Sequence, residues 1–245
     1  MTLTDALLDP YRAGPAAARP LLTYYDDATG ERVELSATTT ANWAAKAANL
    51  LRDECDVEPG TPVAVLLPAH WQAAAVLLAA WWCGAEVVGE PAAAEWVLCD
   101  AGRVDLALAA EPAGGVVALS LDAFGRGVGG LPAGVVDFAP EVRLHGDDFT
   151  PWDAVPGSAP ALAAPALAGS TVAEVLADAS GRATALGIGA GDRVLSILDW
   201  STVDGLIDGL LAVLAAGASL VQCRNADPAT LDRRAAAEKA TVRLG

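Results

Sequence analysis

The sequence predicts an α/β fold built from two duplicated βαβ-type units with parallel sheets. One observation is a repeated block, in which residues 57–67 return as residues 188–198. A second is that each copy then runs through a long apolar stretch to a Gly-Ala pair, at 84–85 and at 217–218. A third is the order of strand-like, helix-like and strand-like segments within each copy, which is typical of parallel βαβ units.

The spacing of the glycines relates the two copies. Gly191 lies 131 positions after Gly60, and Gly217 lies 133 positions after Gly84. The second copy therefore carries two more residues between these marks than the first. In such open parallel sheets, ligands bind beyond the carboxyl ends of the strands.

The chain before the first copy predicts a hairpin and a helix. Residues 21–25 and 32–35 are rich in β-forming side chains and flank a Gly-containing turn at 26–30. Thr39 or Thr40 is expected to cap the helix that follows. Its apolar stripe is formed by Trp43, Ala47, Leu50 and Leu51.

Within the copies, residues 63–67 predict a strand that is apolar throughout and therefore covered on both faces. A helix is expected at 71–83. In the second copy we expect Ser170 or Thr171 to cap a helix, followed by a strand at 194–198. The last helix carries an apolar stripe formed by Leu206, Ile207, Leu210, Leu211 and Leu214.

The region between the copies is harder to assign. Residues 104–109 and 116–121 resemble further strands, whereas 125–165 is rich in Gly and Pro and predicts a long connection with short strands. The expected organisation is a hairpin and first α/β unit at 1–120, an irregular connection at 121–165 and a second α/β unit at 166–245, together forming one compact domain.

Composition excludes several classes of function. The 245 residues are 53% hydrophobic, which gives ample material for a core, and their formal charge of −16 repels nucleic acid and anionic lipid. We interpret the acidity as a solvated surface rather than as recruitment of a basic partner. The longest apolar run, 73–85, is too short to cross a bilayer of about 30 Å.

The termini and cysteines predict a soluble, cytoplasmic protein. The first residues carry no basic segment ahead of an apolar one, so no secretory signal is expected. The four cysteines show no metal-binding spacing and are interpreted as reduced thiols. They are Cys55, Cys83, Cys99 and Cys223.

In their order and spacing, these segments resemble the N-terminal region of the AMP-forming acyl-CoA synthetases and their adenylate-forming relatives. The resemblance rests on Leu-Thr-Tyr at 22–24, Ala-Asn-Leu-Leu at 48–51, the Pro-Gly-containing block at 59–68, the second block at 186–221 and Asp-Pro at 227–228. It covers about two thirds of the chain and is interrupted from residue 120 to residue 167. It implies the fold of part of a synthetase N-terminal domain.

Two departures bear on activity. The resemblance implies a Ser/Thr/Gly-rich phosphate loop with a lysine, but residues 157–171 contain no lysine. Its weak nucleotide-binding candidates are Gly169, Ser170 and Thr171, which we interpret instead as a helix cap. The family's later adenine, magnesium and ribose motifs and its C-terminal domain are not expected in these 245 residues.

The second departure concerns the loop after the second strand, which the resemblance places at an acyl pocket. Asp199 stands where the family usually has a proline, and Thr202 where it usually has a histidine, so an acyl pocket of the family type is not expected. The loops that follow the two strands still provide the ligand-cleft candidates. These are Pro68, His70, Trp71, Asp199, Trp200, Ser201, Thr202 and Asp204.

No catalytic residue is predicted. A triad of Ser201, His70 and Asp199 lacks the Gly-x-Ser-x-Gly turn of hydrolases, and Asp199 and Ser201 are interpreted as helix caps. With His70 and His145 the only histidines, no metal site is expected.

The leading hypothesis is a non-catalytic relative that acts in binding or scaffolding, without cofactors and with another protein chain as a possible partner. One alternative is a minimal or split acyl-activating ligase, of the AMP-forming acid-thiol type, that uses ATP and magnesium and is completed by another chain. Another is a small-molecule binding protein. The ligand and the oligomeric state are left open.

Overall fold

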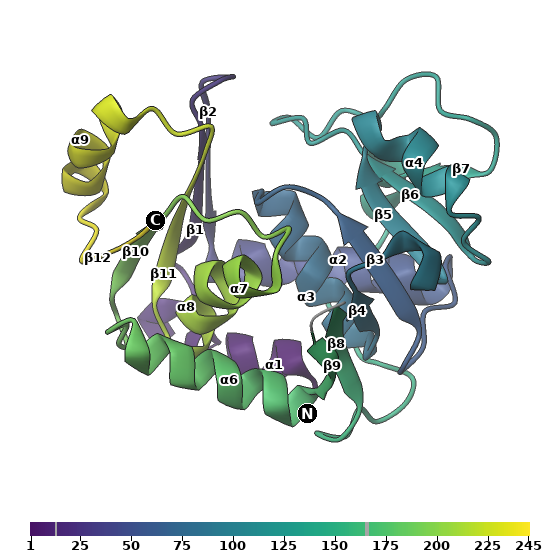
Figure 1. Ribbon diagram of the computed structural model, residues 1–245, viewed down its shortest axis with the longest axis horizontal. Helices are drawn as coiled ribbons and strands as arrows, with labels where there is room; N and C mark the ends of the chain where they lie inside the picture. The colour runs from purple at the N-terminus through teal and green to yellow at the C-terminus, as the bar shows by residue number, and fades with distance from the viewer. Residues whose placement is uncertain (13, 165–166) are drawn as a thin grey trace. The chain divides into compact units, whose positions relative to one another are not determined.

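The computed structural model describes residues 1–12, 14–164 and 167–245, and the chain forms two compact units. Unit 1 consists of Met1–Asp5, Asn42–Leu67 and Ala75–Val175, and unit 2 consists of Ala6–Ala41, Pro68–Ala74 and Leu176–Gly245. Each unit contains one sheet in which parallel pairing predominates (Figure 1). The predicted α/β class is confirmed.

The sheet of unit 1 has seven strands in the order β7-β6-β5-β3-β4-β8-β9. Its strands are β3 (Pro62–Leu66), β4 (Glu86–Val88), β5 (Trp96–Asp100), β6 (Gly115–Leu119), β7 (Val135–Asp137), β8 (Pro160–Ala164) and β9 (Leu167–Thr171). The helices α4 (Val104–Ala109) and α5 (Phe138–Val142) belong to this unit. The helices α1 (Leu3–Leu8), α2 (Ala37–Asp53), α3 (Trp71–Cys83) and α6 (Val172–Ala185) contain residues of both units.

The sheet of unit 2 has five strands in the order β12-β10-β11-β1-β2. Its strands are β1 (Pro20–Asp26), β2 (Glu31–Ser36), β10 (Arg193–Ser196), β11 (Ser219–Arg224) and β12 (Val242–Leu244). Its helical segments include α7 (Val203–Leu206), a π-helical turn at Ile207–Leu211, α8 (Ala212–Ala215) and α9 (Pro228–Glu238). The predicted hairpin is confirmed as β1 and β2, which pair antiparallel.

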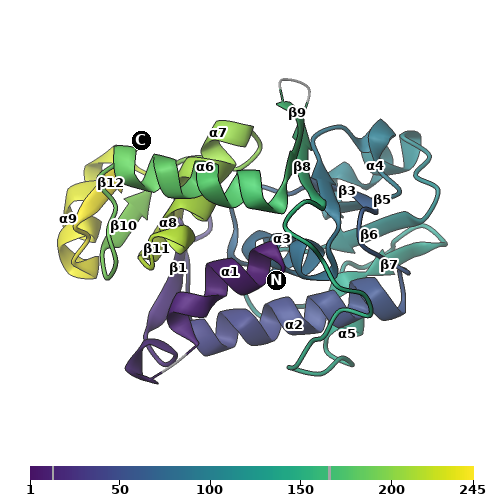
Figure 2. The same ribbon diagram turned by 90° about the horizontal axis from the view of Figure 1, so that it is seen from below.

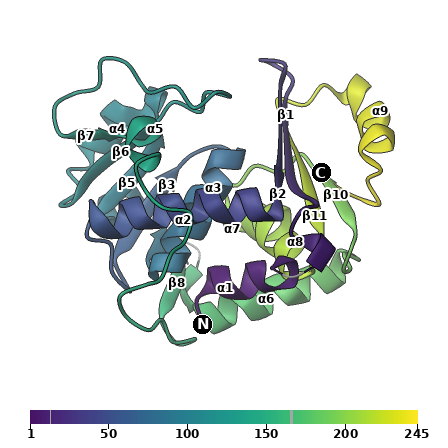
Figure 3. The same cartoon turned by 180° about the vertical axis from the view of Figure 1, so that it is seen from behind.

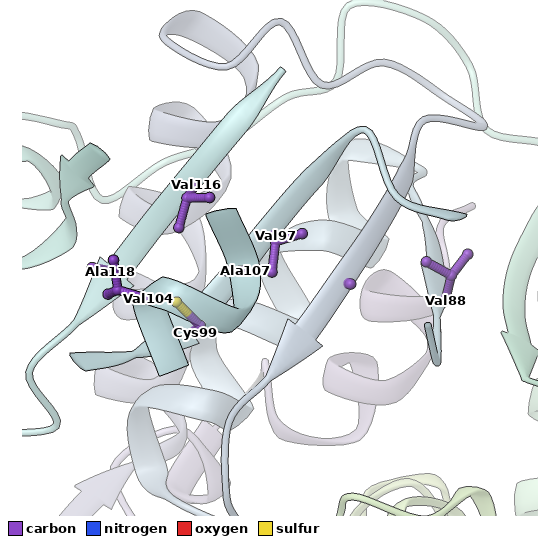
Figure 4. Close-up of a cluster of buried hydrophobic side chains, with 8 residues drawn as sticks. Val88, Val97, Cys99, Val104, Ala107, Val116 and Ala118 are labelled. Carbon is purple, nitrogen blue, oxygen red and sulfur yellow. The ribbon is translucent and has the colours of Figure 1, made fainter. Parts of the chain in front are cut away.

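The expected strand at 104–109 is wrong, because this segment forms helix α4. Val104 and Ala107, three positions apart, point toward β5 and β6 and are buried there, whereas Leu106 and Leu108 face outward. Figure 4 shows the two inward side chains over Val97 and the other apolar residues of the sheet. The helical spacing of the buried residues explains the error, since so short an apolar run fits either period.

The duplication is reproduced in the strand register of the two units. In unit 1, Pro62 of β3 pairs with Glu86 of β4. In unit 2, Arg193 of β10 pairs with Ser219 of β11. Arg193 lies 131 positions after Pro62, and Ser219 lies 133 positions after Glu86, which are the spacings of the repeated glycines. The two βαβ segments therefore have the same register.

The turns before β3 and β10 also share an equivalent main-chain hydrogen bond. Gly60 N donates to Gly84 O at 2.8 Å, and Gly191 N donates to Gly217 O at 3.0 Å. All four glycines have φ between +73° and +90°, a backbone conformation that side chains disfavour. The repeated Gly signature therefore records a shared backbone requirement.

The repeat extends further back than the sequence comparison indicated. The hairpin β1–β2 has a counterpart in the hairpin β8–β9, and both show a register shift after a proline, Pro20 or Pro160. The last residue of each hairpin caps the next helix: Thr39 N donates to Ser36 Oγ at 3.1 Å, and Glu174 N donates to Thr171 Oγ1 at 3.3 Å. The expected cap at Thr39 or Thr40 is wrong, because Ser36 has that position, whereas the alternative of Thr171 is confirmed.

The connection predicted for residues 125–165 contains more regular structure than expected. It includes β7, α5 and the start of the β8–β9 hairpin. Asp137 caps α5 by accepting a bond from Ala139 N, and its carboxylate also accepts from Val128 N at 2.8 Å. Residue 165, at the end of the predicted connection, and residue 166, at the start of the predicted second unit, lie outside the described residues.

Helix α9 covers one face of the sheet of unit 2, partly through charged contacts (Figure 1). Glu238 accepts hydrogen bonds from Tyr25, Arg32 and Arg193. Burial raises the pKa of Glu238, but these three donors outweigh it and lower the pKa to about 2. Arg234 lies over the ring of Tyr25 at 4.2 Å and forms an ion pair with Asp27. The carboxylate network therefore fastens α9 to the sheet.

Candidate functional site

The predicted cleft residues follow the strands β3 and β10, and all of them belong to unit 2. One of the two inserted residues of the second copy lies here, because the offset between the copies is 131 where β3 and β10 begin and 132 where the following helices begin, at Trp71 and Val203. Both helices that follow have 13 residues, at 71–83 and 203–215. The second loop is thus the longer one, and it holds Trp200.

His70 is buried, with 1% of its surface exposed, at the start of α3. Its Nδ1 accepts a hydrogen bond from Gln72 N at 3.1 Å, so this side chain caps the helix, and the proton of the neutral ring lies on Nε2. That Nε2 is 3.7 Å from Glu31 Oε1 and has no hydrogen-bond partner among the described residues. Burial lowers the pKa of His70 against the opposing effect of Glu31, which favours the neutral ring.

Sequence reasoning missed the polar groups around His70. Its ring meets the ring of Tyr24 at 4.4 Å, and Glu31 also accepts a bond from Trp71 Nε1 at 3.3 Å. Asp26, next to Tyr24 on the same strand face, accepts from Tyr24 Oη at 3.3 Å. Tyr24, Asp26 and Glu31 lie in the hairpin, about 40 positions before His70, so no local motif could reveal the cluster.

Trp200 is packed in the loop between β10 and α7. It is 6% exposed, and its Nε1 would lie 3.0 Å from a Cβ placed on Gly209. Gly209 belongs to the π-helical turn, a widened turn that often accompanies functional or strained sites. A Cβ at this position would crowd the indole, which would have to move by a few tenths of an ångström. The tryptophan is a packed group, and its Nε1 has no hydrogen-bond partner among the described residues.

The polar residues around Trp200 stabilise the local backbone. Thr202 caps α7 by accepting from Gly205 N at 3.1 Å, while Asp199 accepts from Ser201 N at 3.2 Å. Asp204 forms an ion pair with Arg182 at 2.6 Å. The interpretation of Asp199 and Ser201 as caps is therefore wrong, since Thr202 has this role. Pro68, in the other loop, is half-buried.

The weak nucleotide candidates form the end of a hairpin. Gly169, Ser170 and Thr171 lie in β9, which pairs antiparallel with β8 (Figure 2). Thr171 Oγ1 accepts a hydrogen bond from Glu174 N, and the Glu174 carboxylate accepts one from Thr171 N, which is the reciprocal pattern of a capping box.

Metal-binding and membrane-spanning features were sought in the described part of the chain. It contains no group of three or more side chains suited to a metal, and none of its helices is long and apolar enough to cross a bilayer. His145 offers its main-chain oxygen to Lys46 Nζ at 2.5 Å. All four cysteines are buried and form no disulfide, and Cys83 Sγ donates to Ala48 O at 3.4 Å.

Comparison with known proteins gives the family. The chain is 54% identical over 245 residues to a "TIGR03089 family protein" of Mycobacterium tuberculosis (strain ATCC 25618 / H37Rv), and the match covers 98% of this chain and 97% of that protein. The chain belongs to the TIGR03089 family. No protein-family model matches the sequence.

Solved structures share the fold of this TIGR03089 member. An acyl-CoA synthetase of Brucella canis superposes with a TM-score of 0.81 at 19% identity, over 99% of this chain and 47% of that one. Acetoacetyl-CoA synthetase of Streptomyces lividans gives 0.77 at 19% identity, over 100% and 42%. A benzoate CoA ligase of Burkholderia xenovorans LB400 gives 0.74 at 17%, over 100% and 50%.

These matches confirm that the fold resembles part of acyl-CoA synthetases. The likeness runs through residues 120–167, where the sequence resemblance was interrupted, because the aligned share reaches the whole chain. The TIGR03089 chain spans about half the length of each of these enzymes. At such low identity, the comparison concerns the fold alone.

Proposed function

We propose that the chain is a non-catalytic relative of the N-terminal domain of AMP-forming acyl-CoA synthetases and acts in binding or scaffolding. The observation that carries the proposal is the composition of the segment where the family resemblance places a phosphate loop. Residues 157–171 contain neither Lys nor Arg, and β8 and β9 within this segment pair antiparallel. A phosphate site needs free backbone amides or a cation to offset the ligand's charge.

The loops that follow β3 and β10 also support this function. His70 and Trp200 are buried and packed, and Thr202 and Asp204 are engaged in a helix cap and an ion pair. These side chains are therefore engaged in contacts within the protein rather than offered to a ligand. A small-molecule site in the loop after β10 has less support, since a ligand would have to displace the Trp200 indole.

A pyrophosphate-exchange assay tests the proposal. The purified chain is incubated with ATP, magnesium, labelled pyrophosphate and fatty or aromatic acids, and label appearing in ATP is measured. We expect no exchange above the protein-free background. Acid-dependent exchange by the chain alone would overturn the proposal. Thr171→Ala and the matched cap variant Ser36→Ala would then locate the activity, because only Thr171 adjoins the proposed loop position.

A second candidate is a ligase completed by another chain. The observation that favours it is the shared fold over 99–100% of this chain but only 42–50% of the solved enzymes. The test isolates a tagged chain from its native host and repeats the exchange assay on the co-purified fraction. Exchange that disappears when the tagged chain is removed supports the split ligase, and a fraction without exchange refutes it.

A further inference from the structure

A segment of unit 1 lies along one face of α2. This segment, residues 145–153, follows α5 and crosses the helix in Figure 3. Asn49 Nδ2 donates to Asp148 O at 2.9 Å, and Arg52 Nη1 donates to Thr150 O at 2.6 Å. Together with Lys46, these side chains are three positions apart and share a helix face. The segment is therefore held by repeated side-chain to main-chain bonds.

Arg52 also places an exposed tryptophan. Its guanidinium lies 4.9 Å from the ring of Phe149 and 5.4 Å from that of Trp152. Asp53 Oδ1 accepts from Arg52 Nε at 2.6 Å, which offsets the positive charge. Trp152 is nevertheless 61% exposed. The protein holds one face of this indole and leaves a large part of the ring to solvent.

A hollow adjoins Trp152. It is small and opens to solvent, so it presents a surface rather than an enclosed site. Part of its lining is apolar, from Val57, Pro59, Phe149, Pro151 and Trp152. Glu58 and Asp153 contribute carboxylates to the same lining.

The charge around the hollow is unbalanced. Unit 1 contains 18 Asp and Glu against five Lys and Arg, a net charge of −13 out of the −16 of the chain. Near the hollow, four exposed acidic residues form no ion pair within the described part of the chain. They are Glu54, Asp56, Glu58 and Asp153. An incoming cation would find unpaired carboxylates beside an aromatic surface.

We propose that the Trp152 hollow is a docking site for a lysine- or arginine-bearing segment of a partner protein. The proposal rests on the binding or scaffolding function and names its surface and the chemistry of its partner. The cation lies against the open part of Trp152 and between the carboxylates of Glu58 and Asp153, since aromatic faces attract cations and tryptophan is frequent among residues that dominate binding energy.

The test uses a fluorescein-labelled hexa-arginine peptide and a hexa-serine control, with binding measured by fluorescence anisotropy at about 150 mM salt, where the Debye length is about 8 Å. We expect saturable binding of hexa-arginine only. Trp152→Ala should weaken it about tenfold. Phe124→Ala, which removes another exposed aromatic ring of unit 1, should change it less than twofold.

Charge-matched variants separate the hollow from general attraction. Glu58→Gln/Asp153→Asn and Asp105→Asn/Glu111→Gln each remove two exposed carboxylates of unit 1. The first pair should weaken binding about tenfold, and the second less than threefold. Equal losses for both pairs, or no saturable binding, would overturn the docking site. Trp152→Phe retains a ring over Arg52 and should keep most of the affinity. Melting curves of all the variants show whether any loss of binding comes from a loss of folding.

The same preparations enter the pyrophosphate-exchange assay. Exchange by the chain alone would refute the non-catalytic function whatever the peptide result. Indifference of hexa-arginine binding to the hollow variants, without exchange, would refute the docking site and leave the proposed function standing.

Discussion

Replacing Trp200 with alanine tests whether the end of the second copy is packed or open. Trp200 is 6% exposed and lies against Gly209 in the π-helical turn. Truncation of a buried Trp costs about 3–5 kcal/mol. The indole N–H has no partner within the described residues, so its removal also relieves a burial cost of about 1–3 kcal/mol. We expect a net loss of about 2 kcal/mol in the free energy of unfolding.

The measurement is urea unfolding followed by far-UV circular dichroism. Trp200→Phe keeps most of the ring and removes the unpaired N–H, so its free energy of unfolding should stay within about 1 kcal/mol of the parent. Trp152→Ala, at a 61% exposed position, should cost under about 1 kcal/mol. A loss for Trp200→Ala no larger than for Trp152→Ala would refute the packing argument and revive a ligand site beneath a movable indole.

Three further outcomes follow from the structure. The pKa of Glu238 is lowered to about 2 from an ordinary value of 4.5, so its contribution to stability is present above pH 4.5 and lost as the pH falls toward 2. Glu238→Gln should therefore weaken the fall in the free energy of unfolding between pH 4.5 and pH 2, measured by urea unfolding. An unchanged fall would contradict the role of Glu238 in holding α9. Ser36→Ala and Thr171→Ala remove equivalent caps and should each cost about 1 kcal/mol in the same measurement, whereas a neutral result for either would contradict its capping role. The buried cysteines should react with a thiol reagent at pH 8 only on unfolding, and rapid labelling of the native chain would contradict their burial. They are Cys55, Cys83, Cys99 and Cys223, and burial raises the pKa of Cys55 and of Cys83 to about 12 and that of Cys99 to about 11.

The repeated glycines made the fold predictable from the sequence. Gly60 and Gly191 need positive φ in the turn before a strand, and their counterparts Gly84 and Gly217 need it after a helix. Few other residues meet this requirement, so the signature survives where the surrounding side chains differ. The same reasoning failed for α4, where six residues give too little periodicity to distinguish a helix from a strand.

The candidate site was only partly accessible to sequence reasoning. His70 and Trp200 were identified because they follow strands, but their surroundings depend on long-range pairing. Tyr24 and Glu31 reach His70 through the β1–β2 hairpin, and Gly209 admits Trp200 through a π-helical turn. The Trp152 hollow likewise depends on a segment that returns to α2 about 100 positions later. Such contacts leave no local pattern in the chain.

Titration calorimetry with magnesium ATP measures nucleotide binding without requiring an acid substrate or a second chain. We expect no saturable heat up to millimolar nucleotide, because residues 157–171, where the family resemblance places a phosphate loop, contain no Lys or Arg. Magnesium-dependent binding of one ATP per chain at micromolar affinity would contradict it.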